Sequence, residues 1–220
     1  TSCNKDYSCA KGFCPSFVVV TGGSLCKKAG ALAAGREAFL EHVAALPSPP
    51  AHSWQAPYDL LVTGVGGTGV VTVGAVIAMA AHLEGKSASV LDFMGFAQKG
   101  GAVLSFVRLA DTPQRLNQVR IDTQQADAIL ACDVVVGASP EALQTVRHGR
   151  TRILANTHQI PVAESLRNPD ADLKIPLLLE KMQFVAGREQ VQTFDAQTLA
   201  EEFLGDTLAS NILATGYAWQ

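Results

Sequence analysis

The chain has 220 residues, of which 48% are hydrophobic and 17% charged, and its formal net charge is -3. This composition is that of a globular protein with one core of ordinary size and a smaller appendage, and it excludes a disordered chain. Because no run of lysine or arginine occurs, we expect neither nucleic acid nor an anionic membrane as a partner. No apolar run is long enough to span a bilayer and no charged leader precedes one, so we expect a cytoplasmic protein.

The first 26 residues contain four of the five cysteines: Cys3, Cys9, Cys14 and Cys26. A structural disulfide is disfavoured in a cytoplasmic chain. Cys3 and Cys9 are farther apart than the paired cysteines of a zinc knuckle. The spacing is instead that of a degenerate bacterial ferredoxin run, C-x2-C-x2-C-x3-C-P, in which Asp6 stands at the second ligand and Cys14 with Pro15 closes the run. We therefore predict an iron–sulfur segment over residues 1–26.

The fourth ligand of this predicted cluster, which we expect to be of the four-iron type, stays open. Asp6 could supply an oxygen, Cys26 could supply a sulfur, or a cysteine upstream of Thr1 could do so. A zinc site and three reduced thiols without metal remain as alternatives. Cys132 lies in an apolar stretch and is interpreted as a small core residue.

Residues 27–57 are predicted to be a linker. They begin with an alanine-rich stretch that permits a helix, "AGALAAGREAFLEHVAALP", and continue into "PSPPAHSWQAP", whose prolines block regular structure. The pattern changes at Tyr58, where short apolar runs begin to alternate with helical ones.

Residues 58–220 are predicted to form an α/β domain. "YDLLVTG", "SASVLDF" and "AVLSFVRL" are predicted strands, and a helix follows the first of them. "CDVVVGA" is predicted as a further strand, then a helix with Ser139 as N-cap and Pro140 at its first position, then the strands "TRILANT" and "QVQTF". Continuous apolar strands of this kind are typical of an open, mostly parallel, Rossmann-like sheet with helices on both faces.

A glycine loop, "GVGGTG", follows the first predicted strand. Gly64, Gly66 and Gly69 have the G-x-G-x-x-G spacing, with Gly67 and Thr68 among them. Such glycines let the backbone approach a pyrophosphate at a helix N-terminus. Asp92 closes the second predicted strand, about where an acid that binds a ribose would stand.

The same loop has a second interpretation, in which its glycines only permit a tight turn and close packing of helix on strand. "DFMGFAQKGGAVLSF", which begins at Asp92, brings large apolar residues and leaves little room for an adenosine ribose. Both interpretations stay open on the residues alone, although Gly64, Gly66, Gly67, Thr68 and Gly69 are the candidate cofactor-binding residues.

The two halves of the chain together resemble the long, single-chain indolepyruvate ferredoxin oxidoreductases of bacteria, in the 2-oxoacid:ferredoxin oxidoreductase superfamily. The resemblance covers nearly the whole chain. It is carried by "CNKDYSCAKGFCPSFVVVTGG", "GVGGTGVVTVG", "QKGGAV" and "LGDTLASNILATGYAWQ".

The resemblance implies that the α/β unit is a gamma-type domain packed against domains that bind thiamine diphosphate and Mg. It implies oxidative decarboxylation of an aryl-2-oxo acid, transfer of the product to coenzyme A, and ferredoxin as electron acceptor, in a parent enzyme that is a homo-oligomer. The sequence lacks a G-D-G…N motif for the diphosphate, so we expect no catalytic residue here and an inactive fragment of something larger. The alternatives are a nucleotide-binding module or NAD-dependent dehydrogenase, and a purely structural interaction domain.

Overall fold

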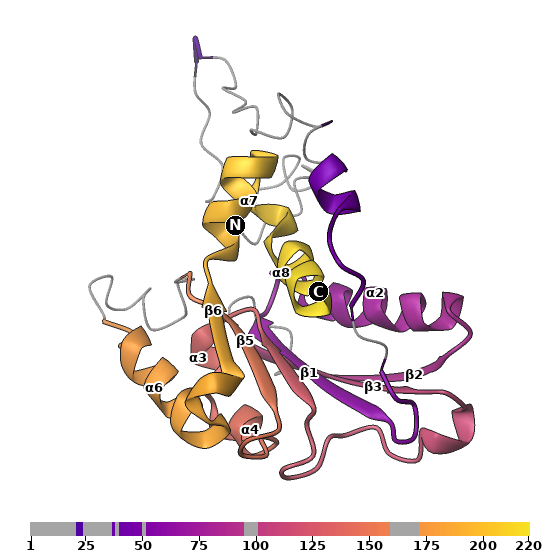
Figure 1. The fold of residues 1–220 in the computed structure, drawn as a ribbon. Helices are drawn as coiled ribbons and strands as arrows, with labels where there is room; N and C mark the ends of the chain where they lie inside the picture. Colours follow the sequence, from indigo (N-terminus) through magenta and orange to yellow (C-terminus); the bar gives the residue numbers. More distant parts are fainter. Residues whose placement is uncertain (1–20, 24–36, 38–39, 50–51, 95–100, 159–171) are drawn as a thin grey trace.

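The computed structural model describes residues 21–23, 37, 40–49, 52–94, 101–158 and 172–220 (Figure 1). The five residues expected to hold iron lie outside this part of the chain: Cys3, Asp6, Cys9, Cys14 and Cys26. Within the predicted linker, residues 40–44 are helical. Among the described residues, no helix is both long and apolar enough to cross a membrane.

The remaining described residues form one α/β unit, with short 3-10 helices labelled η. Its elements in chain order are β1 (Tyr58–Val65), α2 (Val70–Leu83), β2 (Ser87–Met94), β3 (Ala102–Ala110), η2 (Pro113–Arg115), β4 (Ala128–Ala131), α3 (Val134–Gly137), α4 (Pro140–Leu143), β5 (Arg152–Asn156), α6 (Ile175–Ala186), η3 (Arg188–Gln190), β6 (Val191–Phe194), α7 (Ala196–Leu204), η4 (Thr207–Ala209) and α8 (Ser210–Trp219).

The strands of this unit form a single mixed sheet. Their order is β2-β3-β1-β4-β5-β6. Strands β1, β4, β5 and β6 run parallel to one another, whereas β3 is antiparallel to both of its neighbours, β1 and β2. The predicted fold class, a mostly parallel α/β sheet, is therefore confirmed.

Strand β3 lies between β1 and β2, so these two strands are not neighbours. The connection from β2 to β3 spans only residues 95–101. A crossover to a parallel neighbour needs a dozen or more residues, whereas a short connection returns the chain antiparallel. The short connection therefore explains why the third strand turns back beside the second.

One predicted strand is wrong. Residues 132–138, "CDVVVGA", were expected to be extended, but the strand is β4, which ends at Ala131, and Val134–Gly137 form helix α3. Asp133 begins this helix, because its side-chain Oδ1 accepts a hydrogen bond from the Val136 N–H at 2.9 Å. The N-cap interaction outweighs the preference of consecutive valines for a strand. The predicted Ser139 cap and Pro140 start of α4 are confirmed.

Helices cover both faces of the sheet (Figure 1). Adjacent residues of β1 face opposite sides: Leu61 packs with residues of α3, α4 and α6, and Val62 packs with residues of α2, α7 and α8. Both side chains are completely buried. The central strand is thus apolar on two faces, as its continuous run of apolar residues predicts.

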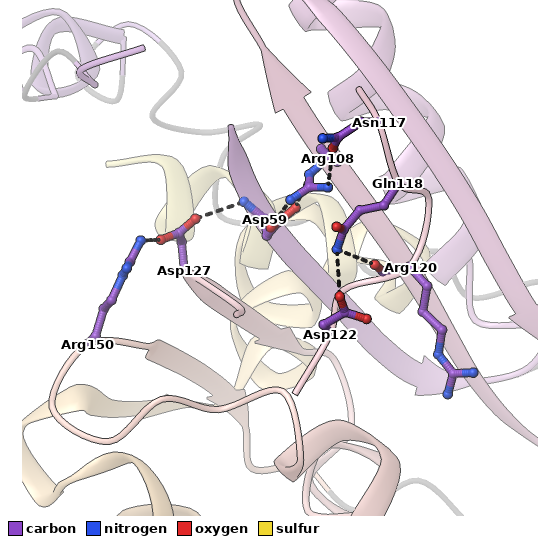
Figure 2. A network of polar contacts seen from close by, with 8 residues as sticks. All are labelled: Asp59, Arg108, Asn117, Gln118, Arg120, Asp122, Asp127 and Arg150. Carbon is purple, nitrogen blue, oxygen red and sulfur yellow. Dashed lines mark hydrogen bonds and ion pairs between the residues drawn. The ribbon is translucent and has the colours of Figure 1, made fainter. Parts of the chain in front are cut away.

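A network of charged and polar side chains joins the strands at the end of the sheet where β1 and β4 begin (Figure 2). Arg108 of β3 forms a two-pronged ion pair with Asp59 of β1, with both nitrogen–oxygen distances at 2.9 Å and both side chains nearly buried. The Asp59 N–H donates to Asp127 Oδ2 at 2.9 Å, and Asp127 Oδ1 lies 2.6 Å from Arg150 Nη2. An ion pair therefore joins β3 to β1, and a hydrogen bond from the β1 main chain joins β1 to the residue before β4.

Candidate functional site

The candidate site lies at the carboxyl ends of β1 and β4. After β1 the chain continues to β2, which lies toward one edge of the sheet. After β4 it continues to β5, which lies toward the other edge. Ligands of open α/β sheets bind in the crevice at such a reversal of strand order. The glycine loop, residues 64–69, includes the end of β1 and the turn that leads to α2 at this position.

Hydrogen bonds within the domain hold the glycine loop in a tight turn. The Thr68 side-chain hydroxyl and the Thr68 N–H both donate to the Val65 carbonyl, at 2.7 and 3.2 Å. The Gly66 N–H donates to the Gly101 carbonyl, just before β3, at 2.7 Å. The residue that precedes β3 thus supports the loop from one side.

Close packing and backbone conformation explain three of the loop's glycines. A Cβ at Gly64 would lie 2.7 Å from Val70 Cγ2 and 3.2 Å from Cys132 Cβ, so only glycine lets α2 and the end of β4 approach this closely. Gly67 and Gly69 have φ angles of 87° and 91°, which other residues rarely adopt. Packing and backbone conformation thus account for these three glycines without any ligand.

Replacing Gly64 by alanine is expected to lower the free energy of unfolding by about 1–3 kcal/mol, because the added methyl group overpacks the contact between β1 and α2. Gly216→Ala is the control, since a Cβ at that position in α8 would meet no atom within 4 Å. Urea denaturation followed by circular dichroism measures both variants. A Gly64→Ala chain as stable as the wild type would contradict a packing role for this glycine.

The last helix also holds the loop. Asn211, in the first turn of α8, donates from Nδ2 to the Thr68 carbonyl at 2.7 Å, and this side chain is buried. The contact joins residues 143 positions apart. The sequence gives no sign of it, because a single asparagine in a helix has no local signature for a distant partner. Asn211 is therefore a site residue that the sequence analysis missed.

A second buried asparagine joins the neighbouring strand ends. Asn156, at the end of β5, donates from Nδ2 to the Cys132 carbonyl at 3.0 Å and to Gln197 Oε1 at 2.6 Å. Its Oδ1 accepts from the Ala196 N–H, at the start of α7, at 3.0 Å. This side chain satisfies one main-chain group just after β4 and one at the start of α7, a role that the sequence analysis also missed.

Asp133 and Asp195, two titratable groups at the carboxyl ends of the strands, have structural roles as helix caps. Burial raises the pKa of the Asp133 carboxyl, against the hydrogen bonds that it accepts from the N–H groups of Val136 and Val135. Asp195 caps α7 and lies 3.4 Å from the ring nitrogen Nδ1 of His158. Among the described residues, no group of three or more histidine, cysteine, aspartate or glutamate side chains could hold a metal ion.

Cys132 is a buried core residue, as interpreted from its sequence. Burial raises the pKa of its thiol to about 12. We expect Cys132 to stay unmodified by iodoacetamide at pH 8 in the folded chain, because only about one thiol in ten thousand is then ionised. Mass spectrometry of the peptide that contains it measures the labelling, and the chain unfolded in guanidinium is the control. Labelling at equal rates in both states would contradict the assignment.

The geometry does not favour a dinucleotide at the glycine loop. In nucleotide-binding folds of this type, the acid that binds the ribose ends the strand beside β1. Here Asp92 lies on β2, opposite Ser105 of β3, and β3 separates it from β1. Two strand spacings place its main chain about 10 Å from β1. Asp92 is thus on the wrong strand for the role that its distance along the sequence indicated.

The fold and the site together define a class of protein: an α/β domain with a Rossmann-like glycine loop, an antiparallel strand beside it, and a last helix that secures the loop. The family model for pyruvate ferredoxin/flavodoxin oxidoreductase matches residues 59–220. The chain belongs to this family, and its α/β unit is a gamma-type domain of the 2-oxoacid:ferredoxin oxidoreductase superfamily.

Curated relatives and a solved structure agree with this family. The chain is 41% identical over 83 residues to the pyruvate/ketoisovalerate oxidoreductases common subunit gamma of Thermococcus litoralis, a match that covers 38% of this chain and 40% of that protein. It is 26% identical over 166 residues to the indolepyruvate oxidoreductase subunit IorB of Pyrococcus horikoshii, covering 72% and 75%. The pyruvate oxidoreductase subunit PORC of Thermotoga maritima has the same fold, with a TM-score of 0.53 at 18% identity, covering 74% and 75%.

Proposed function

We propose that this chain is the gamma-type part of an enzyme that oxidises 2-oxo acids, with indolepyruvate or another aryl-2-oxo acid as substrate and ferredoxin as electron acceptor. The family match over residues 59–220 carries the proposal. The subunit names of the relatives support it, since they include indolepyruvate oxidoreductases. The glycine loop supports it as well, because the domain's own side chains hold it and β3 separates Asp92 from β1.

In this proposal the reacting carbon is activated elsewhere in the enzyme. Thiamine diphosphate, held with Mg by other domains, supplies the electron sink for decarboxylation, and coenzyme A accepts the acyl product. The present chain packs against those domains in a parent enzyme that is a homo-oligomer of the cytoplasm. The isolated chain is then inactive, because its sequence lacks the diphosphate motif.

The amino-terminal residues 1–26 carry electrons in this proposal. Cys3, Cys9 and Cys14 bind a four-iron cluster, with Asp6 or Cys26 as the fourth ligand, and residues 27–57 link this segment to the gamma-type domain. Thiolates at these spacings are ligands typical of iron–sulfur clusters. The assignment rests on the sequence, since these residues lie outside the described part of the chain. A cofactor contact by the glycine loop also stays a prediction.

An activity assay of the complete enzyme that contains this chain tests the proposal. The enzyme is purified without oxygen and given coenzyme A, methyl viologen, and indolepyruvate, phenylpyruvate, pyruvate or 2-oxoglutarate in separate reactions. We expect dye reduction with the aryl substrates above all, and none by the 220-residue chain alone. A complete enzyme that fails to reduce the dye with any of these four 2-oxo acids would overturn the proposal.

Calorimetric titration of the 220-residue chain with NAD tests the alternative function. We expect no measurable heat of binding at micromolar concentrations. A micromolar dissociation constant that Gly69→Ala removes would instead support a nucleotide-binding module.

A further inference from the structure

The last part of the predicted linker lies against the α/β unit. Residues 52–57, "HSWQAP", come directly before β1 and are described by the structure. Proline-rich linkers serve as extended, semi-rigid spacers, and this role needs no contact with a folded domain. Residues 52–57, here called the strap, nevertheless make contacts with the unit through both their main chain and their side chains. These contacts are more than a spacer requires.

Arg115, in η2, holds the main chain of the strap. Its Nη1 donates to the carbonyl of Trp54 at 2.9 Å and to the carbonyl of Gln55 at 2.6 Å. The residues that these bonds join are 61 and 60 positions apart. Hydrogen bonds from a charged donor are stronger than those between neutral groups. Because both acceptors are main-chain atoms, the guanidinium determines the path of the chain itself.

The unit holds Arg115 in position for this contact. Asp111, the residue after β3, has its Oδ1 3.4 Å from Arg115 Nε, and the Arg115 N–H donates to the Thr112 carbonyl at 3.2 Å. The guanidinium therefore lies between Asp111 and the strap. The Arg115 side chain is 42% exposed. Since these contacts are at the surface, the strap can open without unfolding the core.

The rings of the strap add side-chain contacts to this main-chain anchor. The Lys86 ammonium, just before β2, lies 4.9 Å from the ring centroid of Trp54, within the range of a cation–π interaction. The His52 ring packs edge to face with Trp54 and with Tyr58, at centroid distances of 5.0 and 5.1 Å. Tyr58 is the first residue of β1, so these rings join the strap to the sheet.

A second contact holds the chain farther upstream, beside α8. Gln220, the residue after this helix, donates from Nε2 to the Pro47 carbonyl at 2.7 Å. The helical residues 40–44 come shortly before Pro47, and Figure 1 shows them near the end of α8. The same helix carries Asn211, whose side chain holds the glycine loop. The chain thus contacts the unit at two separate places before β1 begins.

We propose that the strap docks the end of the linker onto the α/β unit, so that the amino-terminal part of the chain leaves the unit at a fixed place beside the end of α8 and not from a free tether at Tyr58. The composition of the strap suits this role, because the fixed φ angle of Pro57 lowers the conformational entropy that docking costs. The proposal concerns the path of the chain and goes beyond the proposed function, which it neither requires nor tests.

Cleavage by chymotrypsin after Trp54 tests the docking in the 220-residue chain. A protease cuts a folded segment only when that segment opens, so the rate follows the population of the open strap. We expect Arg115→Met to speed this cleavage about tenfold or more, and Lys86→Met to speed it less. Arg188→Met is the matched control, because this exposed arginine lies in η3, just before β6 at the edge of the sheet. Equal rates in the wild type and Arg115→Met would overturn the proposal.

Fluorine NMR of the chain labelled with 5-fluorotryptophan tests the docking in the wild type, where no variant can disturb the fold. The chain has two tryptophans, Trp54 and Trp219, and Trp219→Phe assigns their signals. We expect the Trp54 signal to lie away from its position in the urea-unfolded chain, and Lys86→Met to move it toward that position. A wild-type Trp54 signal at the unfolded position would overturn the proposal.

A photo-crosslinker next to Pro47, p-benzoylphenylalanine in place of Ser48, tests where the chain leaves the unit. We expect a crosslink within the same chain to the last turn of α8, residues 216–220. The same group in place of Gln144, an exposed residue at the end of α4, is the control and should not label α8. Crosslinks from position 48 that are spread over the whole unit, or that miss α8, would contradict a fixed exit.

Discussion

Replacing Arg108 by methionine is expected to lower the free energy of unfolding by about 3–5 kcal/mol at pH 7. The guanidinium forms a two-pronged ion pair with Asp59, and the two side chains are 11% and 6% exposed. Methionine fills a similar volume but leaves the Asp59 carboxylate buried without its partner. Chemical denaturation of the two chains measures the difference.

Two further variants separate the charge from the packing. Arg150→Met removes the partner of Asp127, but the Arg150 side chain is 52% exposed, so a loss below about 1 kcal/mol is expected. Asp59→Asn combined with Arg108→Met should recover part of the stability, since no charge then stays buried. An Arg108→Met chain no less stable than Arg150→Met would contradict the assigned importance of burial.

The effect of Arg108→Met should also depend on pH. Burial raises the pKa of Asp59, although the adjacent Arg108 lowers it, so removing Arg108 raises the pKa further. A carboxyl with a raised pKa in the folded state binds a proton there that the unfolded chain has already lost. The contribution of Asp59 to stability is therefore fully present below its pKa in the unfolded chain, and it is lost as pH rises through its pKa in the folded chain. The variant should come closest to the wild type near pH 4.

Replacing Cys9 by alanine is expected to remove most of the iron–sulfur absorption near about 400 nm after reconstitution with iron and sulfide under anaerobic conditions. The proposed ligand set has three closely spaced thiolates, Cys3, Cys9 and Cys14, so the loss of the central one leaves too few sulfurs to bind the cluster. Iron and sulfide analysis of the same samples measures the loss independently of the spectrum. Cys132→Ala is the matched control, because that thiol is buried in the core.

The fourth ligand can be found with two more variants. Asp6→Cys should raise four-iron incorporation if Asp6 faces the cluster, because a carboxylate is a harder and weaker ligand for iron among sulfides than a thiolate. Cys26→Ala should lower incorporation if Cys26 closes the site instead. Failure of the wild-type chain to take up iron, or a full spectrum from a chain without Cys3, Cys9 and Cys14, would refute the assignment.

The sequence predicts which segments are strands or helices better than it predicts which of them lie side by side. The strands β1, β2, β3, β5 and β6 follow from apolar runs between turn residues, and the cap at Ser139 follows from the preference of serine for that position. The error at residues 132–138 arose because valines favour strands, while the competing signal was a single aspartate. The N-cap of α3 shows that one side-chain hydrogen bond at a helix start can decide between the two states.

The contacts of the candidate site could not be predicted in the same way. The insertion of β3 beside β1 and the hydrogen bond from Asn211 to Thr68 depend on which distant segments meet, and no periodicity in one sequence encodes that. The short β2–β3 connection was an available signal for the antiparallel turn. The predicted iron ligands, which lie outside the described residues, stay a prediction.

The hydrogen bond between Asn211 and Thr68 has a consequence for the order in which the domain matures during translation. A nascent chain released from the ribosome tunnel up to β3 already has β1, α2, β2 and β3, which pair locally and can assemble early. The glycine loop at their edge stays without its anchor until α8, synthesised more than a hundred residues later, has emerged. A loop made near the beginning of the domain thus acquires its final support only from a helix that is translated much later.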